Sequence, residues 1–108
     1  MMLTRNGFHS DLHWVNELRL SKLTPAYSTA GGAMFRVDAI ELLRRLPSNS
    51  VDLVMTSPPF ALTRKKEYGN ESFDRYLEWF MPFCEEIKRV LKDTGSFVLD
   101  IGGAWLDT

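Results

Sequence analysis

The order of apolar and helical segments constrains the fold of this chain more than any other feature. Short apolar runs at 33–37, 51–55 and 96–101 each suit a β-strand, and helical patterns at 39–46 and 72–92 lie between them. Strands that alternate with helices predict a parallel sheet with right-handed crossovers. Run 51–55 is apolar on both faces except at Asp52, which predicts that helices cover both sides. We therefore expect an α/β fold, with a partial Rossmann-like sheet in a three-layer α/β/α arrangement.

The two helical segments differ in regularity. Residues 39–46 point Ile40, Leu43 and Leu46 inward, and the turn-forming residues 47–50 end that helix. Segment 72–92 carries one apolar stripe at three-to-four spacing, and Pro82 is expected to kink or split it. The stripe consists of Phe73, Leu77, Phe80, Cys84, Ile87 and Leu91. We interpret Trp79 as packing rather than as a stacking platform.

The N-terminal third is less regular. Pro25 and the Gly31–Gly32 pair predict a loop over 24–32, and Ser10 could cap a short helix over 11–20. We therefore divide the chain into an N-terminal extension and loop, 1–32, and an incomplete α/β domain, 33–108.

Composition narrows the possible environments and partners. The formal net charge is −1, whereas a free-standing nucleic-acid binder usually shows a basic face, so the composition of the whole chain does not predict strong nucleic-acid binding by itself. Cys84 is the single cysteine, and no run approaches the ~20 apolar residues of a membrane span, which predicts a cytoplasmic protein. His9 and His13 have helical metal-ligand spacing but no third ligand nearby, so no metal site is expected.

Three polar residues sit at the carboxyl ends of the three predicted strands. Asp38, Ser57 and Asp100 come from separate parts of the sequence. Ligands of parallel α/β sheets bind beyond the carboxyl ends of the strands. The topology therefore predicts a site at this edge.

The segment Ser57-Pro58-Pro59-Phe60 carries the most specific chemistry. Neither proline has a backbone N–H, and both fix their own φ, so the turn is stiff and its oxygens have few competing donors. The Ser57 hydroxyl and the Pro58 carbonyl could accept the two hydrogens of an exocyclic amino group, which would aim the nitrogen lone pair at a methyl donor. Phe60 offers a flat face for a base extruded from a duplex.

In these residues the chain resembles the amino-group DNA methyltransferases of permuted class β. Thr56 to Phe60 looks like their motif IV, and its serine is typical of the cytosine-N4 members. Further matching segments run in order from Pro25 to Ala104. They are 25–27, 40–43, 53–55, 61–62, 64–70 and 95–98, followed by Asp100, Gly102, Gly103 and Ala104.

The resemblance implies a function and a set of roles. The function is transfer of a methyl group from S-adenosylmethionine to cytosine N4 in double-stranded DNA with a flipped base, in a restriction-modification setting. Residues 57–60 would hold the base, Asp38 would contact the adenine end of the cofactor, and Asp100 could help take the proton lost from the amine. In the family, the glycine-rich cofactor motif comes late in the chain. No such loop occurs here, so we expect an N-terminal fragment.

Simpler structural interpretations remain open for several of these residues. Asp38 could only cap the following helix, Asp100 could only make a turn, and residues 57–60 could be a plain proline turn. The run Arg64-Lys65-Lys66 could contact DNA phosphates or could be a solvated loop.

Two other functions also remain open. The chain could act on adenine N6. It could also be a catalytically silent piece, whose exposed sheet edges and apolar face need a complementing C-terminal part or self-association.

Overall fold

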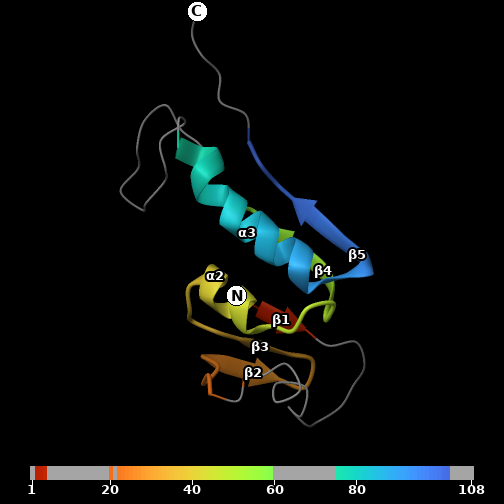
Figure 1. Cartoon of the computed structure of the whole chain (residues 1–108). Coiled ribbons are helices and arrows are strands. Elements are labelled where there is room, and N and C mark those ends of the chain that lie inside the picture. Colours follow the sequence, from red (N-terminus) through yellow and green to blue (C-terminus); the bar gives the residue numbers. More distant parts are fainter. Residues whose placement is uncertain (1, 5–19, 21, 60–74, 103–108) are drawn as a thin grey trace, which may run out of the picture.

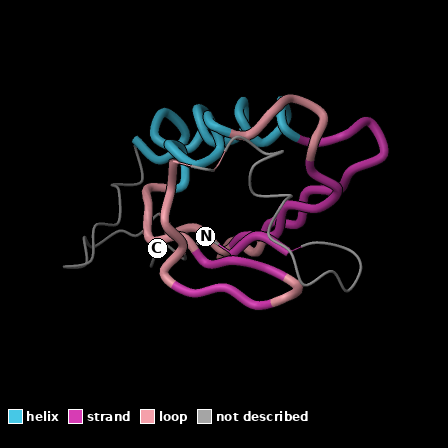
Figure 2. Tube along the Cα trace, turned by 90° about the horizontal axis from the view of Figure 1, so that it is seen from below, coloured by secondary structure: helices cyan, strands magenta, loops and turns pink. Residues whose placement is uncertain are grey.

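The computed structural model describes residues 2–4, 20, 22–59 and 75–102. In chain order the elements are β1 (Met2–Thr4), β2 (Tyr27–Thr29), β3 (Gly32–Met34), α2 (Ala39–Arg45), β4 (Val51–Thr56), α3 (Tyr76–Val90) and β5 (Leu91–Leu99) (Figure 1). Figure 2 shows the helices together along one side of the molecule, with strands below them. The helix predicted over 11–20 lies outside the described residues, apart from Leu20, which is buried.

The strands form two separate sheets, whereas the sequence led us to expect one. Strand β3 lies between β1 and β2 and is antiparallel to both. The expectation that 33–37 joins the parallel sheet was therefore wrong. The loop predicted over 24–32 was wrong at 27–29, which form β2, and at Gly32, where β3 begins. The reason is a tight turn between Thr29 and Gly32, which pair with each other and fold β2 back onto β3.

Strands β4 and β5 are parallel and α3 precedes β5 directly, as the alternation of elements predicts. The pairing runs from Leu53 opposite Ser96 to Thr56 opposite Leu99, after an irregularity near Asp52. Strand β5 begins at Leu91, earlier than the predicted 96. The Leu53 and Met55 side chains are 51% and 69% exposed, so the described elements cover one face of β4, not both as expected.

Helix α2 agrees with its prediction more closely than α3 does. Asp38 caps α2, and Leu43 and Leu46 are buried together with Leu42, which the prediction did not include. Helix α3 runs through Pro82 as one helix, so of the two expected effects, a kink or a split, the split is wrong.

The buried stripe of α3 also differs from the predicted one. Tyr76, Phe80, Ile87 and Val90 are buried, whereas Leu77 is 72% exposed. The predicted stripe was placed about one residue out of phase at its N-terminal end. Phe80 and Ile87 belong to both the predicted and the observed buried stripe. These two shared positions therefore do not determine which of the neighbouring residues is buried.

The hydrophobic core lies between α2, the C-terminal half of α3, and β3 together with Phe35, which follows β3. It consists of Leu20, Ala33, Phe35, Leu42, Leu43, Leu46, Ile87 and Val90. Within the described part of the chain, no helix is long and apolar enough to cross a membrane.

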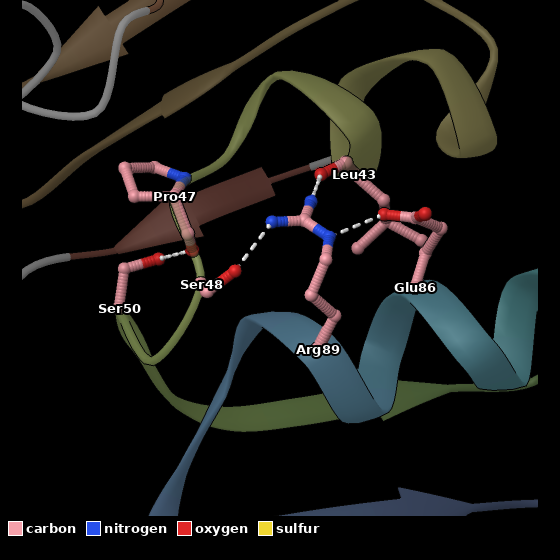
Figure 3. Close-up of polar contacts among 6 residues, drawn as sticks. All are labelled: Leu43, Pro47, Ser48, Ser50, Glu86 and Arg89. Carbon is pink, nitrogen blue, oxygen red and sulfur yellow. Dashed lines mark hydrogen bonds and ion pairs between the residues drawn. The ribbon is translucent and has the colours of Figure 1, made fainter.

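Arg89 fastens α2 to α3 (Figure 3). Its Nη2 donates to the Leu43 carbonyl at 2.8 Å, its Nε to Glu86 at 2.8 Å, and its Nη1 to the Ser48 hydroxyl at 3.2 Å. The Asn49 and Ser50 N–H groups donate to the Arg89 and Val90 carbonyls, which satisfies acceptors left open at the end of α3. The turn before β4 is therefore anchored to the helix that follows β4 in the chain.

A candidate nucleoside-binding cavity at the end of strand β4

A cavity of about 500 Å³ opens where β4 ends, between the start of α2 and one side of α3. Its volume lies within the range of small-molecule sites. The residues that line it are Asp38, Ala39, Leu43, Val54, Met55, Thr56, Ser57, Pro58, Pro59, Trp79, Phe80, Phe83 and Ile87. The cavity thus combines polar groups at a strand end with an apolar helical wall.

The turn after β4 provides the polar rim of the cavity. Ser57 and Pro59 are exposed and Pro58 is buried. Because neither proline can donate a hydrogen bond, the backbone here offers acceptors to a ligand rather than donors. The site residues Ser57, Pro58 and Pro59 therefore lie beside a space large enough for a nucleoside. Phe60 lies outside the described residues.

Asp38 reaches the same cavity from the other side. Its Oδ1 accepts a hydrogen bond from the Ile40 N–H at 3.0 Å, so the helix-cap interpretation describes a contact that is present. Because Asp38 also lines the cavity, the cap does not exclude a role toward a ligand. The structure brings Asp38 and Ser57 together, although β3 is not part of the parallel sheet.

Asp100 lies next to the end of β4 but not in the cavity wall. Its N–H donates to the Thr56 carbonyl at 3.0 Å, which extends the β4–β5 pairing by one step, and the residue is exposed. It is not among the residues that line the cavity. The predicted convergence therefore holds for Asp38 and Ser57, while a role for Asp100 in the site stays a prediction.

Sequence reasoning missed the aromatic wall. Trp79, Phe80 and Phe83 project from α3 into the cavity lining. The centroid of the Trp79 ring lies 5.2 Å from that of Phe83 and 6.0 Å from that of Phe80. Trp79 and Phe83 are spaced four residues apart, which places them on one side of a helix. That spacing was the signal from which the wall could have been predicted. The two residues lie on a face of the helix next to the stripe that we assigned to the core.

Two titratable groups on α3, Tyr76 and Cys84, have raised pKa values. Burial raises the pKa of the Tyr76 hydroxyl, and the charge of Cys84 adds to the effect. Burial also raises the pKa of the Cys84 thiol, with a further contribution from Glu85. Among the described residues, the Tyr76 hydroxyl has no hydrogen-bond partner.

The other residues that the sequence singled out belong to the N-terminal segment and to the segment after Phe60. Arg64, Lys65 and Lys66, His9 and His13 all lie outside the described residues. Over the residues that are described, no group of three His, Cys, Asp or Glu side chains is arranged to hold a metal ion.

Comparison with known proteins decides the family. The model of the DNA methylase family matches residues 51–106, which is more than half of the chain. This chain belongs to the DNA methylase family. The predicted relationship to amino-group methyltransferases is thereby confirmed. The described helices and strands, together with the similar solved structure reported below, confirm the predicted α/β class.

Individual relatives support the same assignment. The chain is 52% identical over 82 residues to the type II methyltransferase M.PvuII of Proteus hauseri, covering 76% of this chain and 24% of the relative. It is 31% identical over 83 residues to the type II methyltransferase M.BamHI of Bacillus amyloliquefaciens, covering 74% of this chain and 20% of that relative. A solved structure, the PvuII DNA methyltransferase (cytosine-N4-specific), is similar with a TM-score of 0.65 and 51% identity, covering 78% of this chain and 30% of that one. This methylase chain thus spans about a quarter of the length of these relatives.

Proposed function

We propose that this chain is the base-binding part of a site-specific DNA methyltransferase of the restriction-modification type. It would transfer a methyl group from S-adenosylmethionine to cytosine N4 in double-stranded DNA, together with a complementing C-terminal part. The observation that carries the proposal is the Ser57-Pro58-Pro59 turn on the rim of a cavity that also holds Asp38. The 52% identity to M.PvuII supports the choice of reaction.

The residues present fit a nucleoside cofactor. Among the described residues, Asp38 is engaged only through Oδ1, by the Ile40 N–H, which leaves Oδ2 to accept from a hydroxyl or amino donor of a ligand. The aromatic and aliphatic lining suits a planar ring. When bound, S-adenosylmethionine supplies an electrophilic methyl group.

The role of the chain is to prepare the target amine. The Ser57 Oγ accepts one N–H of the exocyclic amine and the Pro58 carbonyl accepts the other, which draws the nitrogen lone pair out of the base ring. Phe60 stacks on the extruded base and fixes its plane. Methyl transfer would form the N–C bond as the S–CH3 bond of the cofactor breaks and S-adenosylhomocysteine leaves. The amine would lose one proton, and Asp100 is the carboxylate that we assign to receive it.

The test is reconstitution with a serine control. The chain is co-produced with the part of M.PvuII that follows the matched region, and methyl transfer to duplex DNA is measured with labelled S-adenosylmethionine. Ser57→Ala is expected to lower kcat by about 10²-fold or more, because positioned polar groups of this kind contribute about that much. The matched control is Ser28→Ala, which alters an exposed serine on β2.

Two results would contradict the proposal. Equal activity of Ser57→Ala and Ser28→Ala would remove the role of the turn. Methylated adenine in the digested product, in place of N4-methylcytosine, would assign the chain to the adenine-N6 reaction instead.

A further inference from the structure

Trp79 and Phe83 are placed unlike the apolar side chains of Phe80 and Leu77 on α3. Phe80 is 8% exposed and belongs to the interior, and Leu77 is 72% exposed on another face of the helix. Trp79 is partly exposed and lines the cavity, one helical turn before Phe83. Its remaining accessible surface is therefore available to a ligand in the cavity.

Neighbouring rings hold the Trp79 ring in place. The Tyr76 ring lies 5.5 Å from it between centroids with the planes at 52°, and the Phe83 ring lies 5.2 Å away at 48°. Tilted contacts on both sides restrict rotation of the indole. A ring that is fixed before binding loses little conformational entropy when a ligand stacks on it.

The charge of the cavity limits what can stack there. Asp38 is the one charged residue among the described lining residues, and no lysine or arginine lies among them. A buried phosphate would face a carboxylate without a compensating cation, which is unfavourable. The described lining is therefore suited to the ring end of a nucleoside, either neutral or cationic, rather than to its phosphates.

We propose that Trp79, braced by Tyr76 and Phe83, is a stacking platform that binds the flat heteroaromatic ring of a nucleoside in this cavity. This inference rests on the proposed function for the identity of the ring, which is either the flipped cytosine or the adenine of the cofactor. It assigns a positioning role to a helix remote in sequence from the Ser57 turn.

The test measures binding rather than activity alone. On the reconstituted protein, the Kd of S-adenosylhomocysteine is measured by equilibrium dialysis. A duplex carrying 2-aminopurine in place of the target base is followed by its fluorescence, which is quenched by stacking. Trp79→Leu is expected to weaken one of the two interactions about ten-fold, the effect of losing one aromatic stack. Trp79→Phe keeps a ring and is expected to restore most of the loss.

Comparing the two probes, and comparing Trp79→Leu with a control variant, distinguishes the possible outcomes. Weaker binding of S-adenosylhomocysteine alone assigns the ring to the cofactor, and a loss of 2-aminopurine quenching alone assigns it to the target base. Leu77→Ala, on the same helix but away from the cavity, is expected to change neither. If Trp79→Leu binds both probes as tightly as Leu77→Ala does, the platform is refuted, even where methyl transfer still depends on Ser57. Normal Trp79-dependent stacking without methyl transfer would refute the proposed function alone.

Discussion

Replacing Arg89 with Met tests whether one side chain fastens α2 to α3. Methionine keeps the aliphatic stem but removes the bonds to Leu43, Ser48 and Glu86. A hydrogen bond to a charged group contributes about 1.5–3 kcal/mol. Because the Leu46 N–H also donates to the Leu43 carbonyl, at 3.1 Å, that acceptor keeps a partner and we take the lower end of this range.

The other two contacts add less. The pair with Glu86 joins side chains that are 33% and 24% exposed, and i,i+3 pairs contribute about 0.3–0.5 kcal/mol. The Ser48 contact is exposed and long at 3.2 Å, so we assign it nothing. Arg89→Met is therefore expected to lower the free energy of unfolding by about 2 kcal/mol.

Urea denaturation followed by far-UV circular dichroism measures this change. For an m-value of about 1.5 kcal/mol/M, the unfolding midpoint should fall by roughly 1.3 M. Glu86→Gln removes only the ion pair and should lower the free energy of unfolding by about 0.5 kcal/mol or less. If Arg89→Met and Glu86→Gln share one midpoint, the bond to Leu43 does not fasten the helices.

Three further predictions follow from packing and burial. Gly95→Ala should lower the free energy of unfolding by about 1–3 kcal/mol, because a Cβ there would lie 3.0 Å from the Lys92 carbonyl oxygen. Gly31→Ala, where a Cβ would meet nothing within 4 Å, should leave the urea midpoint nearly unchanged. Since burial raises the pKa of the Cys84 thiol, its thiolate forms at higher pH in the folded chain than in urea. The neutral Cys84 thiol therefore favours the folded state below the ordinary thiol pKa, and this contribution to stability is lost as pH rises through the raised pKa. If iodoacetamide alkylates Cys84 with the same pH midpoint in the folded chain and in urea, this prediction is wrong. Leu53→Thr with Val98→Thr should reduce self-association in sedimentation, because the two side chains are 51% and 46% exposed on the sheet.

The sequence was most informative where one local signal agreed with the tertiary packing. Helix α2 has a capping residue, Asp38, and a breaker at Pro47, and it occupies nearly the predicted range. Strand β4 is apolar throughout its centre and ends at the proline turn as expected. The approach of Asp38 to Ser57 followed from the rule that sites lie beyond strand ends, and it holds although β3 is antiparallel.

Prediction was wrong where several arrangements satisfied the same pattern. Tyr27 to Thr29 is a short strand that is stabilised by pairing with β3, and no run of apolar residues marks it. On α3, large apolar residues occur on more than one face, so periodicity alone did not tell which of Tyr76 and Leu77 is buried. The buried face is the one on which the Tyr76 ring meets the Phe80 ring, at 5.9 Å between centroids.

The charge of the cavity connects the two proposed ligands. With Asp38 as the one charged group among the described lining residues, this cavity favours ligands that bring a flat ring without bringing a phosphate. A flipped base meets that condition, because rotation about the backbone carries the base inward while its phosphates stay at the duplex. S-adenosylmethionine meets it as well, because its sulfonium is positive and its adenosine has no phosphate. Under the proposed function, the basic groups that contact the DNA backbone are then expected outside the described lining of this cavity.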